Sequence, residues 1–171
     1  MKAYVVDENV PIVANDSVRL EPKAPQADID CRLACVQALR SIVKSGILIV
    51  DSAGEVLENY RRHLQHRGQP GVGDAFFKHI IDHHFNRRKV RRVSLVKNAK
   101  RGFEAFPAEA ALATFDRSDR IYIALALAAL EKPHVLNAVD SDYCEHKAAL
   151  GGAGVHVHEI CPQCIRKPRG G

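Results

Sequence analysis

The sequence lacks any long apolar run, and this excludes a membrane-spanning helix, which needs about 18 consecutive apolar residues. The first ten residues also lack the apolar centre of a secretion signal, because only a short apolar stretch precedes Asp7. No Gly-x-Gly-x-x-Gly phosphate-binding loop is present, and the composition shows no bias towards disorder. We therefore expect a folded, cytoplasmic protein with no membrane partner.

Cysteine is scarce, and its number is odd. The five cysteines are Cys31, Cys35, Cys144, Cys161 and Cys164. An odd number in a chain without a secretion signal favours reduced thiols over a disulfide framework. We therefore expect no disulfide bond.

The cysteines near the end of the chain suggest a zinc site as a secondary hypothesis. Two histidines precede a Cys-x-x-Cys pair there, and the four residues are His156, His158, Cys161 and Cys164. On a strand the two histidines would face the same side, so four zinc ligands could converge, or Cys144 and His146 could contribute. Free thiols that bind no metal are the default interpretation.

The length and overall composition are those of one ordinary folded domain. The chain has 171 residues, of which 46% are hydrophobic and 26% are charged. A chain of this length buries roughly 70% of the surface that its unfolded form exposes. We expect one domain over residues 1–160, followed by a basic tail with the Cys-x-x-Cys pair over residues 161–171.

Apolar patterns predict alternating strands and helices. A three- and four-residue spacing of Ile29, Leu33, Val36, Leu39 and Val43 indicates one face of a helix, which Gly46 ends. Strands are expected over residues 3–6, 47–50, 90–96, 134–139 and 155–160, and further helices over 54–66, 74–85, 119–131 and 143–150. This order predicts an α/β fold, a three-layer α/β/α sandwich around a mostly parallel sheet of roughly five strands.

Aspartates stand where the predicted strands end. Asp7 and Asp140 each end a strand, Asp142 follows closely, and Asp119 opens the apolar helix over 119–131. The carboxyl ends of parallel strands share one edge of a sheet, so these carboxylates should meet there. Clustered carboxylates repel one another, and a bound Mg²⁺ or Mn²⁺ relieves that repulsion. Such a site suits metal-assisted hydrolysis of a phosphodiester.

Each aspartate taken alone has an ordinary structural explanation. An aspartate in the first turn of a helix, such as Asp119, complements the helix dipole. An aspartate after a strand, such as Asp7 or Asp140, is a common turn residue. The prediction of a metal site therefore depends on their combination at equivalent strand ends.

Three segments resemble the acidic motifs of the PIN-domain nucleases. In order along the chain they are YVVDENVPI, SDRIYIALALA and LNAVDSDY. The order and spacing of these motifs and the five-strand pattern match the family over most of residues 1–160. The residues that carry the resemblance are Asp7, Asn9 and Val10 in the first segment, Asp119 in the second, and Asp140, Asp142 and Tyr143 in the third.

The resemblance implies a metal-dependent endonuclease that hydrolyses single-stranded or structured RNA. The metal ligands would be Asp7, Asp119, Asp140 and Asp142, and Asn9 would orient the first carboxylate or the scissile phosphate. Many small members of the family are toxins held by an antitoxin, so an antitoxin is an expected partner, with a homodimer as the other expected assembly.

The family's second acid is a glutamate in the helix after the second strand, and here several acids compete for that role. They are Asp51, Glu55 and Glu58 in VDSAGEVLENY. We favour Glu58, which directly precedes the Asn59–Tyr60 pair, with Glu55 as the alternative.

Basic residues predict a nucleic-acid surface. The net charge is +5, and a phosphate backbone is a natural partner for clustered cations, although a solvated surface is the other interpretation. Positive residues also cluster at Lys97, Lys100 and Arg101 and in the tail at Arg166, Lys167 and Arg169. The candidate nucleic-acid-binding residues are Arg61, Arg62, Arg87, Arg88, Lys89, Arg91 and Arg92.

The sequence leaves three function classes open. A Mg²⁺- or Mn²⁺-dependent endoribonuclease is the first. A non-catalytic RNA-binding or ribosome-associated module on the same fold is the alternative, and the ambiguous second acid is its best support. A receiver-like phosphorylation domain ranks last, because no lysine follows the late strand where such a domain requires one.

Overall fold

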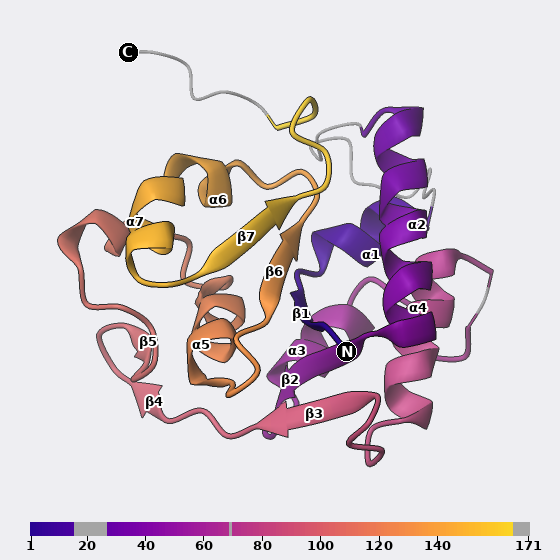
Figure 1. The fold of residues 1–171 in the computed structure, drawn as a ribbon, viewed down its shortest axis with the longest axis horizontal. Helices are drawn as coiled ribbons and strands as arrows, with labels where there is room; N and C mark the ends of the chain where they lie inside the picture. The colour runs from indigo at the N-terminus through magenta and orange to yellow at the C-terminus, as the bar shows by residue number, and fades with distance from the viewer. Residues whose placement is uncertain (16–26, 69, 166–171) are drawn as a thin grey trace.

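The computed structural model describes residues 1–15, 27–68 and 70–165, and its centre is a parallel sheet (Figure 1). The strand order is β3-β2-β1-β6-β7, and every neighbouring pair is parallel. The five strands are β1 (Ala3–Val6), β2 (Ile47–Asp51), β3 (Val90–Val93), β6 (His134–Asn137) and β7 (His156–Glu159). The predicted α/β class and all five predicted strands are confirmed.

Helices cover both faces of this sheet. In Figure 1, α1, α2 and α4 group on one side, and α5, α6 and α7 lie on the other. No helix in the described ranges combines the length and apolar character needed to cross a bilayer. The helices are α1 (Asn9–Ala14), α2 (Ile29–Ser45), α3 (Glu55–Arg61), α4 (Val72–Asp82), α5 (Arg120–Ala128), α6 (Ser141–Glu145) and α7 (Lys147–Gly152), with a 3-10 turn at Ala110–Leu112 and a small antiparallel pair, β4 (Lys97–Asn98) and β5 (Gly102–Phe103).

The central strands and α5 are apolar because other parts of the protein cover them on all sides. All five residues of β2 are buried, as expected of a parallel strand covered on both faces. Every residue from Arg120 to Ala126 in α5 is buried as well, and this helix contacts β1, β2 and β6. A helix that is apolar all round belongs in the interior, so α5 anchors one side of the core against the central strands.

The predicted helix and its end at Gly46 are confirmed by α2, but only part of the predicted apolar stripe is buried. Leu39 is fully buried and Val36 and Val43 pack against the core, as predicted. Ile29 and Leu33 are exposed instead, and Cys31 and Cys35 are fully buried. The pattern counted only aliphatic residues, and a buried cysteine behaves as a small apolar residue. The cysteines therefore face the protein interior.

The structure joins Cys31 and Cys161 in a disulfide, so the expectation of no disulfide is wrong. The two residues are 130 positions apart in the sequence, and their Cα atoms lie 5.2 Å apart. An odd cysteine count cannot reveal a pair that only the tertiary fold brings together. Cys161 is also fully buried, so the predicted tail begins inside the core, and its basic residues Arg166, Lys167 and Arg169 lie outside the described residues.

Candidate metal centre and its surroundings

Three of the predicted aspartates converge at the carboxyl edge of the sheet. Asp7 directly follows β1, Asp140 lies beyond the end of the neighbouring strand β6, and Asp119 is the N-cap residue of α5. One carboxylate oxygen from each lies within 4.8 Å of the other two. Adjacent parallel strands bring their ends together, and α5 packs against both strands, so the fold itself assembles this group.

Asp7 is buried and held at both of its oxygens. Its Oδ1 accepts a hydrogen bond from the backbone N–H of Asn9 at 2.9 Å. Its Oδ2 accepts the hydroxyl hydrogen of Tyr143 at 2.6 Å. A carboxylate oxygen can accept more than one bond, so both atoms keep capacity for a further ligand.

The group is poorly suited to carry three negative charges. Burial raises the pKa of Asp7 from 3.8 to about 7, and the charges of Glu8 and Asp140 add to this, although hydrogen bonds from Asn9 and Tyr143 oppose it. Burial likewise raises the pKa of Asp119 from 3.8 to about 9, with added repulsion from Asp7, Asp140 and other acids. A cation at the centre would reverse both effects by favouring the charged carboxylates.

Hydrogen bonds link the segment before α5 to the segment after β6. Asp140 caps α6 by accepting the N–H of Asp142 at 2.9 Å, and Oδ2 of Asp142 accepts the N–H of Asp116 at 2.5 Å. Asp116 in turn accepts the N–H of Ser118 at 2.9 Å, and the Ser118 hydroxyl contacts Oδ1 of Asp119 at 3.2 Å. The chain of contacts fixes Asp119 beside Asp140. Asp142 supports this arrangement but lies outside the three-aspartate group.

The Asn9 side chain is engaged within the protein at both ends. Its amide nitrogen donates to Oδ1 of Asn137 at 2.9 Å, and its carbonyl accepts the N–H of Ala138 at 2.8 Å. Asn137 is fully buried and also binds the backbone of Asp140, donating to its carbonyl at 2.8 Å and accepting its N–H at 3.1 Å. These two asparagines hold the loops after β1 and β6 together. Sequence reasoning missed Asn137, whose only signal was an amide within an apolar strand.

None of the candidate second acids lies in the three-aspartate group. Glu58 is exposed and pairs with Arg61, and Glu55 pairs with Lys97 at 2.6 Å. Asp51 is buried, and its carboxylate accepts two backbone N–H groups at the start of α3, at 2.8 and 2.9 Å. Each of these acids therefore has a partner away from the aspartates.

Glu8 is a nearby acid that sequence reasoning did not select for the site. It directly follows Asp7, and its charge contributes to the raised pKa of that aspartate. Oε2 of Glu8 accepts the hydroxyl hydrogen of Tyr122 at 3.1 Å, and Asn59 donates to the same hydroxyl oxygen at 3.4 Å. The available signal was the Asp-Glu pair itself, at the end of the first strand.

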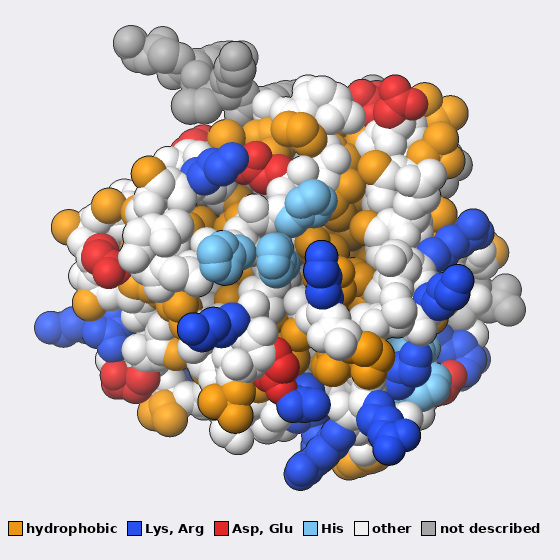
Figure 2. Space-filling view, in the orientation of Figure 1, with side chains coloured by type: hydrophobic (Ala, Val, Ile, Leu, Met, Phe, Trp, Pro, Cys, Tyr) orange, Lys and Arg blue, Asp and Glu red, His pale blue; other side chains and the backbone are white. Residues whose placement is uncertain are grey.

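The predicted basic run is divided between structural and exposed positions. Lys89 donates to the carbonyl of Val43 at 3.1 Å near the end of α2, so its ammonium group is partly engaged in the fold. Figure 2 shows Lys and Arg side chains gathered over β3 and the segment before it. A pocket of about 570 Å³ lies there, lined in part by Arg87, Arg91 and Arg92, and Arg88 is exposed beside them.

A second basic pocket adjoins the aspartates. It has a volume of about 550 Å³, and its cations are Arg62, Lys97 and Arg117. Ser118 also lines it, and the hydroxyl of that residue contacts Asp119. Of the predicted nucleic-acid-binding residues only Arg62 lines this pocket, and Arg117 was missed because it stands alone in the sequence rather than in a run.

The structure does not bring the two histidines of the predicted zinc site together with its Cys-x-x-Cys pair. Cys161 is bonded to Cys31, and both His156 and His158 are exposed on β7. The His156 ring stacks on that of His134, with 5.7 Å between the ring centroids. Within the described part of the chain, the groups able to hold a metal contain neither histidine.

Comparisons of this chain with protein-family models, curated proteins and solved structures found no match. The relationship to PIN-domain nucleases therefore stays a prediction from the three sequence motifs.

Proposed function

We propose that this protein is a divalent-metal-dependent endonuclease that hydrolyses phosphodiester bonds, with RNA rather than DNA as its substrate. The observation that supports this most directly is the convergence of Asp7, Asp119 and Asp140 from three separate segments to within 4.8 Å. Among the described residues this group consists of carboxylates, which are hard oxygen ligands and suit Mg²⁺ or Mn²⁺. The raised pKa values of Asp7 and Asp119 fit a site that is completed by a cation.

The three aspartates would hold the ion, and the surrounding residues would fix their positions. A bound ion lowers the pKa of an attacking water and stabilises charge on the phosphate oxygens. Tyr143 orients one oxygen of Asp7 through its hydroxyl, and Asn137 fixes the backbone of Asp140. These contacts keep the carboxylates in place before substrate arrives.

We assign Glu8 as the additional acid beside the three aspartates, the role that the sequence analysis gave to Glu58 or Glu55. It is the glutamate that directly follows Asp7 and whose charge, like that of Asp140, acts on that residue, whereas Glu58 and Glu55 are paired with cations elsewhere. Its Oε2 has a hydroxyl donor in Tyr122 and retains capacity to accept another hydrogen. In this role Glu8 would take up a proton from the attacking water.

The pocket beside Asp119 would hold the substrate backbone. Arg62, Lys97 and Arg117 bring positive charge to it, and lysine and arginine at such positions contact phosphates without regard to base sequence. A hydrolytic centre needs such a surface, because the aspartates alone repel a polyanion. The antitoxin and the homodimer remain predictions from the resemblance.

The test is cleavage of labelled single-stranded RNA and DNA by the purified chain with Mg²⁺, with Mn²⁺ or with EDTA. Asp7→Asn and Asp140→Asn are run beside the parent protein, with the exposed Asp30→Asn as a matched control. We expect metal-dependent cuts that both site variants reduce at least about 100-fold, because a lost ligand removes several kcal/mol of transition-state stabilisation.

The same experiment can overturn the proposal in separate ways. RNA binding without cleavage under every metal would replace the nuclease by a non-catalytic RNA-binding module. Cleavage that survives both site variants would show a contaminating nuclease. Faster cleavage of DNA than of RNA would overturn the substrate assignment alone. Circular dichroism of each variant separates a lost ligand from a lost fold.

A further inference from the structure

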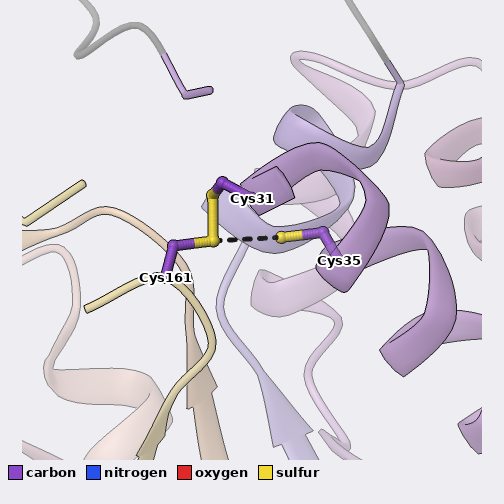
Figure 3. Close-up of side chains that lie close together, drawn as sticks. All are labelled: Cys31, Cys35 and Cys161. Atoms are coloured by element: carbon purple, nitrogen blue, oxygen red, sulfur yellow. Dashed lines mark hydrogen bonds between the residues drawn. A yellow bond between two sulfur atoms is a disulfide. The ribbon is translucent and has the colours of Figure 1, made fainter. Parts of the chain in front are cut away.

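A second group of metal-ligating side chains lies away from the aspartates. Cys31 and Cys35 are one helical turn apart on α2, and Cys161 follows β7 (Figure 3). All three are fully buried, and their sulfur atoms lie within 4.8 Å of one another. The Sγ atoms of Cys35 and Cys161 are 3.9 Å apart. Three cysteine sulfurs from two distant segments, two of them joined in the disulfide, thus point towards one interior position.

A fourth cysteine stands beside this group. The N–H of Cys164 donates to the carbonyl of Cys161 at 2.9 Å, so the two residues are joined by a tight turn. Cys164 is partly buried and packs against the core. The Cys164 sulfur is not one of the three that lie within 4.8 Å of one another in this disulfide-bonded state, and its place in the turn with Cys161 makes it the candidate fourth ligand.

The sequence spacing of these cysteines and the distance between two of their sulfurs fit a tetrahedral zinc site. Cys31-x3-Cys35 and Cys161-x2-Cys164 both fall within the usual two- to four-residue spacing of paired zinc ligands. Zinc–sulfur bonds of about 2.3 Å in a tetrahedron place neighbouring sulfurs about 3.8 Å apart. The 3.9 Å between Cys35 and Cys161 matches that separation.

We propose that the reduced protein binds one zinc ion through Cys31, Cys35, Cys161 and Cys164, as a closed structural site. The Cys31–Cys161 disulfide and this site are alternative states of the same sulfurs. A phosphine reductant with water converts the disulfide to two thiols and itself becomes a phosphine oxide. Zinc then displaces the thiol protons into solvent.

The site would fasten the end of the sheet to α2. Ile160, directly before Cys161, donates its N–H to the carbonyl of Asn137 at 2.8 Å. Asn137 is the buried residue that fixes the backbone of Asp140. A zinc ion that holds the segment after β7 would therefore stabilise the edge of the sheet on which the aspartates stand.

The experiment measures zinc bound to the full chain, purified with a phosphine reductant and then freed of loose metal. The number of zinc ions per chain is measured by elemental mass spectrometry. Zinc is then exchanged for Co²⁺, whose absorption spectrum reports the number of thiolate ligands. Cys35→Ser and Cys164→Ser are compared with Cys144→Ser, which removes an exposed free cysteine. We expect one zinc in the parent and in Cys144→Ser, and at least about tenfold weaker binding in the other two variants.

Three results would overturn the proposal. One is a reduced parent chain that takes up no zinc. Another is zinc binding in Cys35→Ser and Cys164→Ser equal to that in Cys144→Ser, because the ligands would then lie elsewhere. The third is a Co²⁺ spectrum without four thiolates, which needs no variant and so does not depend on whether Cys35→Ser folds. These zinc measurements do not depend on whether the protein cleaves RNA, so the two proposals can fail separately.

Discussion

The aspartate group and the cysteine group differ in almost everything except their size. In each, three ligand atoms from distant segments lie within 4.8 Å of one another. The cysteines are fully buried and come from a helix face and a turn, whereas Asp140 is only half-buried at the end of a strand. The aspartates are also tied to backbone N–H groups and to a tyrosine hydroxyl.

This difference indicates a catalytic role for the aspartate group and a structural role for the cysteine group. Carboxylate oxygens suit a hard ion that keeps water and accepts phosphate oxygens, which requires access from solvent. Four thiolates fill every position on a zinc ion and leave no room for substrate. One small domain would then hold two metals with different tasks, and each task follows from the ligand chemistry and the burial of its group.

The largest expected effect tests whether the two groups are independent. Asp119→Asn should lower cleavage at least about 100-fold, because it removes a ligand of the catalytic ion, and leave zinc content unchanged. Cys164→Ser should do the reverse, with loss of zinc and less than about threefold change in cleavage below its unfolding temperature. The cleavage rate and the zinc content per chain are measured on the same preparations. Equal loss of both properties in either variant would show that the groups act as one site.

A somewhat smaller effect on the cleavage rate tests whether Glu8 is the additional acid beside the three aspartates. Glu8→Gln should lower the cleavage rate by about 100-fold, which is the lower end of the usual contribution of a positioned proton acceptor. Glu58→Gln is the matched control and should stay within about twofold, because Glu58 is exposed and paired with Arg61 at the surface. The measurement is single-turnover cleavage at saturating metal. A large loss in Glu58→Gln with none in Glu8→Gln would restore the assignment made from sequence.

The sequence predicted the parts of the fold that depend on local pattern. Buried parallel strands are continuous apolar runs, so β1 and β2 were visible at once. Helix α1 was missed because it has six residues, no side-chain cap and a proline, Pro11, in its first turn. The predicted helix over 143–150 is two short helices that meet at His146. Short elements of this kind are set by packing rather than by propensity.

The sequence predicted the candidate site where position along a strand determines position in space. Asp7 and Asp140 were placed together because neighbouring parallel strands end at the same edge. The helix after β2 gave no such guide, since Glu58 and Glu55 are one turn apart and only the fold shows that both face other partners. The cysteine group was hidden for the same reason, because Cys31 and Cys161 are 130 residues apart.

The aspartates should also make stability depend on pH. Their folded-state pKa values are raised from 3.8 to about 7 for Asp7 and about 9 for Asp119, so the folded chain binds these protons more tightly than the unfolded chain. The stabilisation is complete below about pH 3.8 and is lost as pH rises through 7 to 9. With EDTA, the free energy of unfolding should fall by several kcal/mol between pH 5 and pH 9, at about 1.4 kcal/mol per pKa unit.

Denaturant unfolding at a series of pH values measures this effect, and Mg²⁺ or Mn²⁺ provides its test. Because the ion favours the charged carboxylates, it should restore the lost stability at pH 9 and have little effect at pH 5. Asp119→Asn should flatten the pH dependence and remove the response to metal. A metal response of equal size at both pH values would mean that the ion binds elsewhere.

The smallest expected effect, a change in KM for RNA, tests which of the two basic pockets binds the substrate that reaches the aspartates. Arg62 lines the pocket beside Asp119, and Arg87 lines the other basic pocket near β3. If substrate passes beside Asp119, Arg62→Gln should raise KM for RNA about three- to fivefold and reduce the salt dependence of binding by about one phosphate contact. Arg87→Gln is the matched control, since it removes the same charge from the other pocket and should change neither quantity.

Lys97 shows why Arg62 is the sharper probe. Lys97 is paired with Glu55 at 2.6 Å, so its removal would leave an uncompensated carboxylate in the pocket and add repulsion to the lost attraction. Arg117 donates to two backbone carbonyls around β4, at 3.2 and 2.9 Å, so its removal would also disturb the fold. If Arg87→Gln raises KM and Arg62→Gln does not, RNA lies across β3 instead. The aspartates would then receive their substrate from the side of β2 and β3.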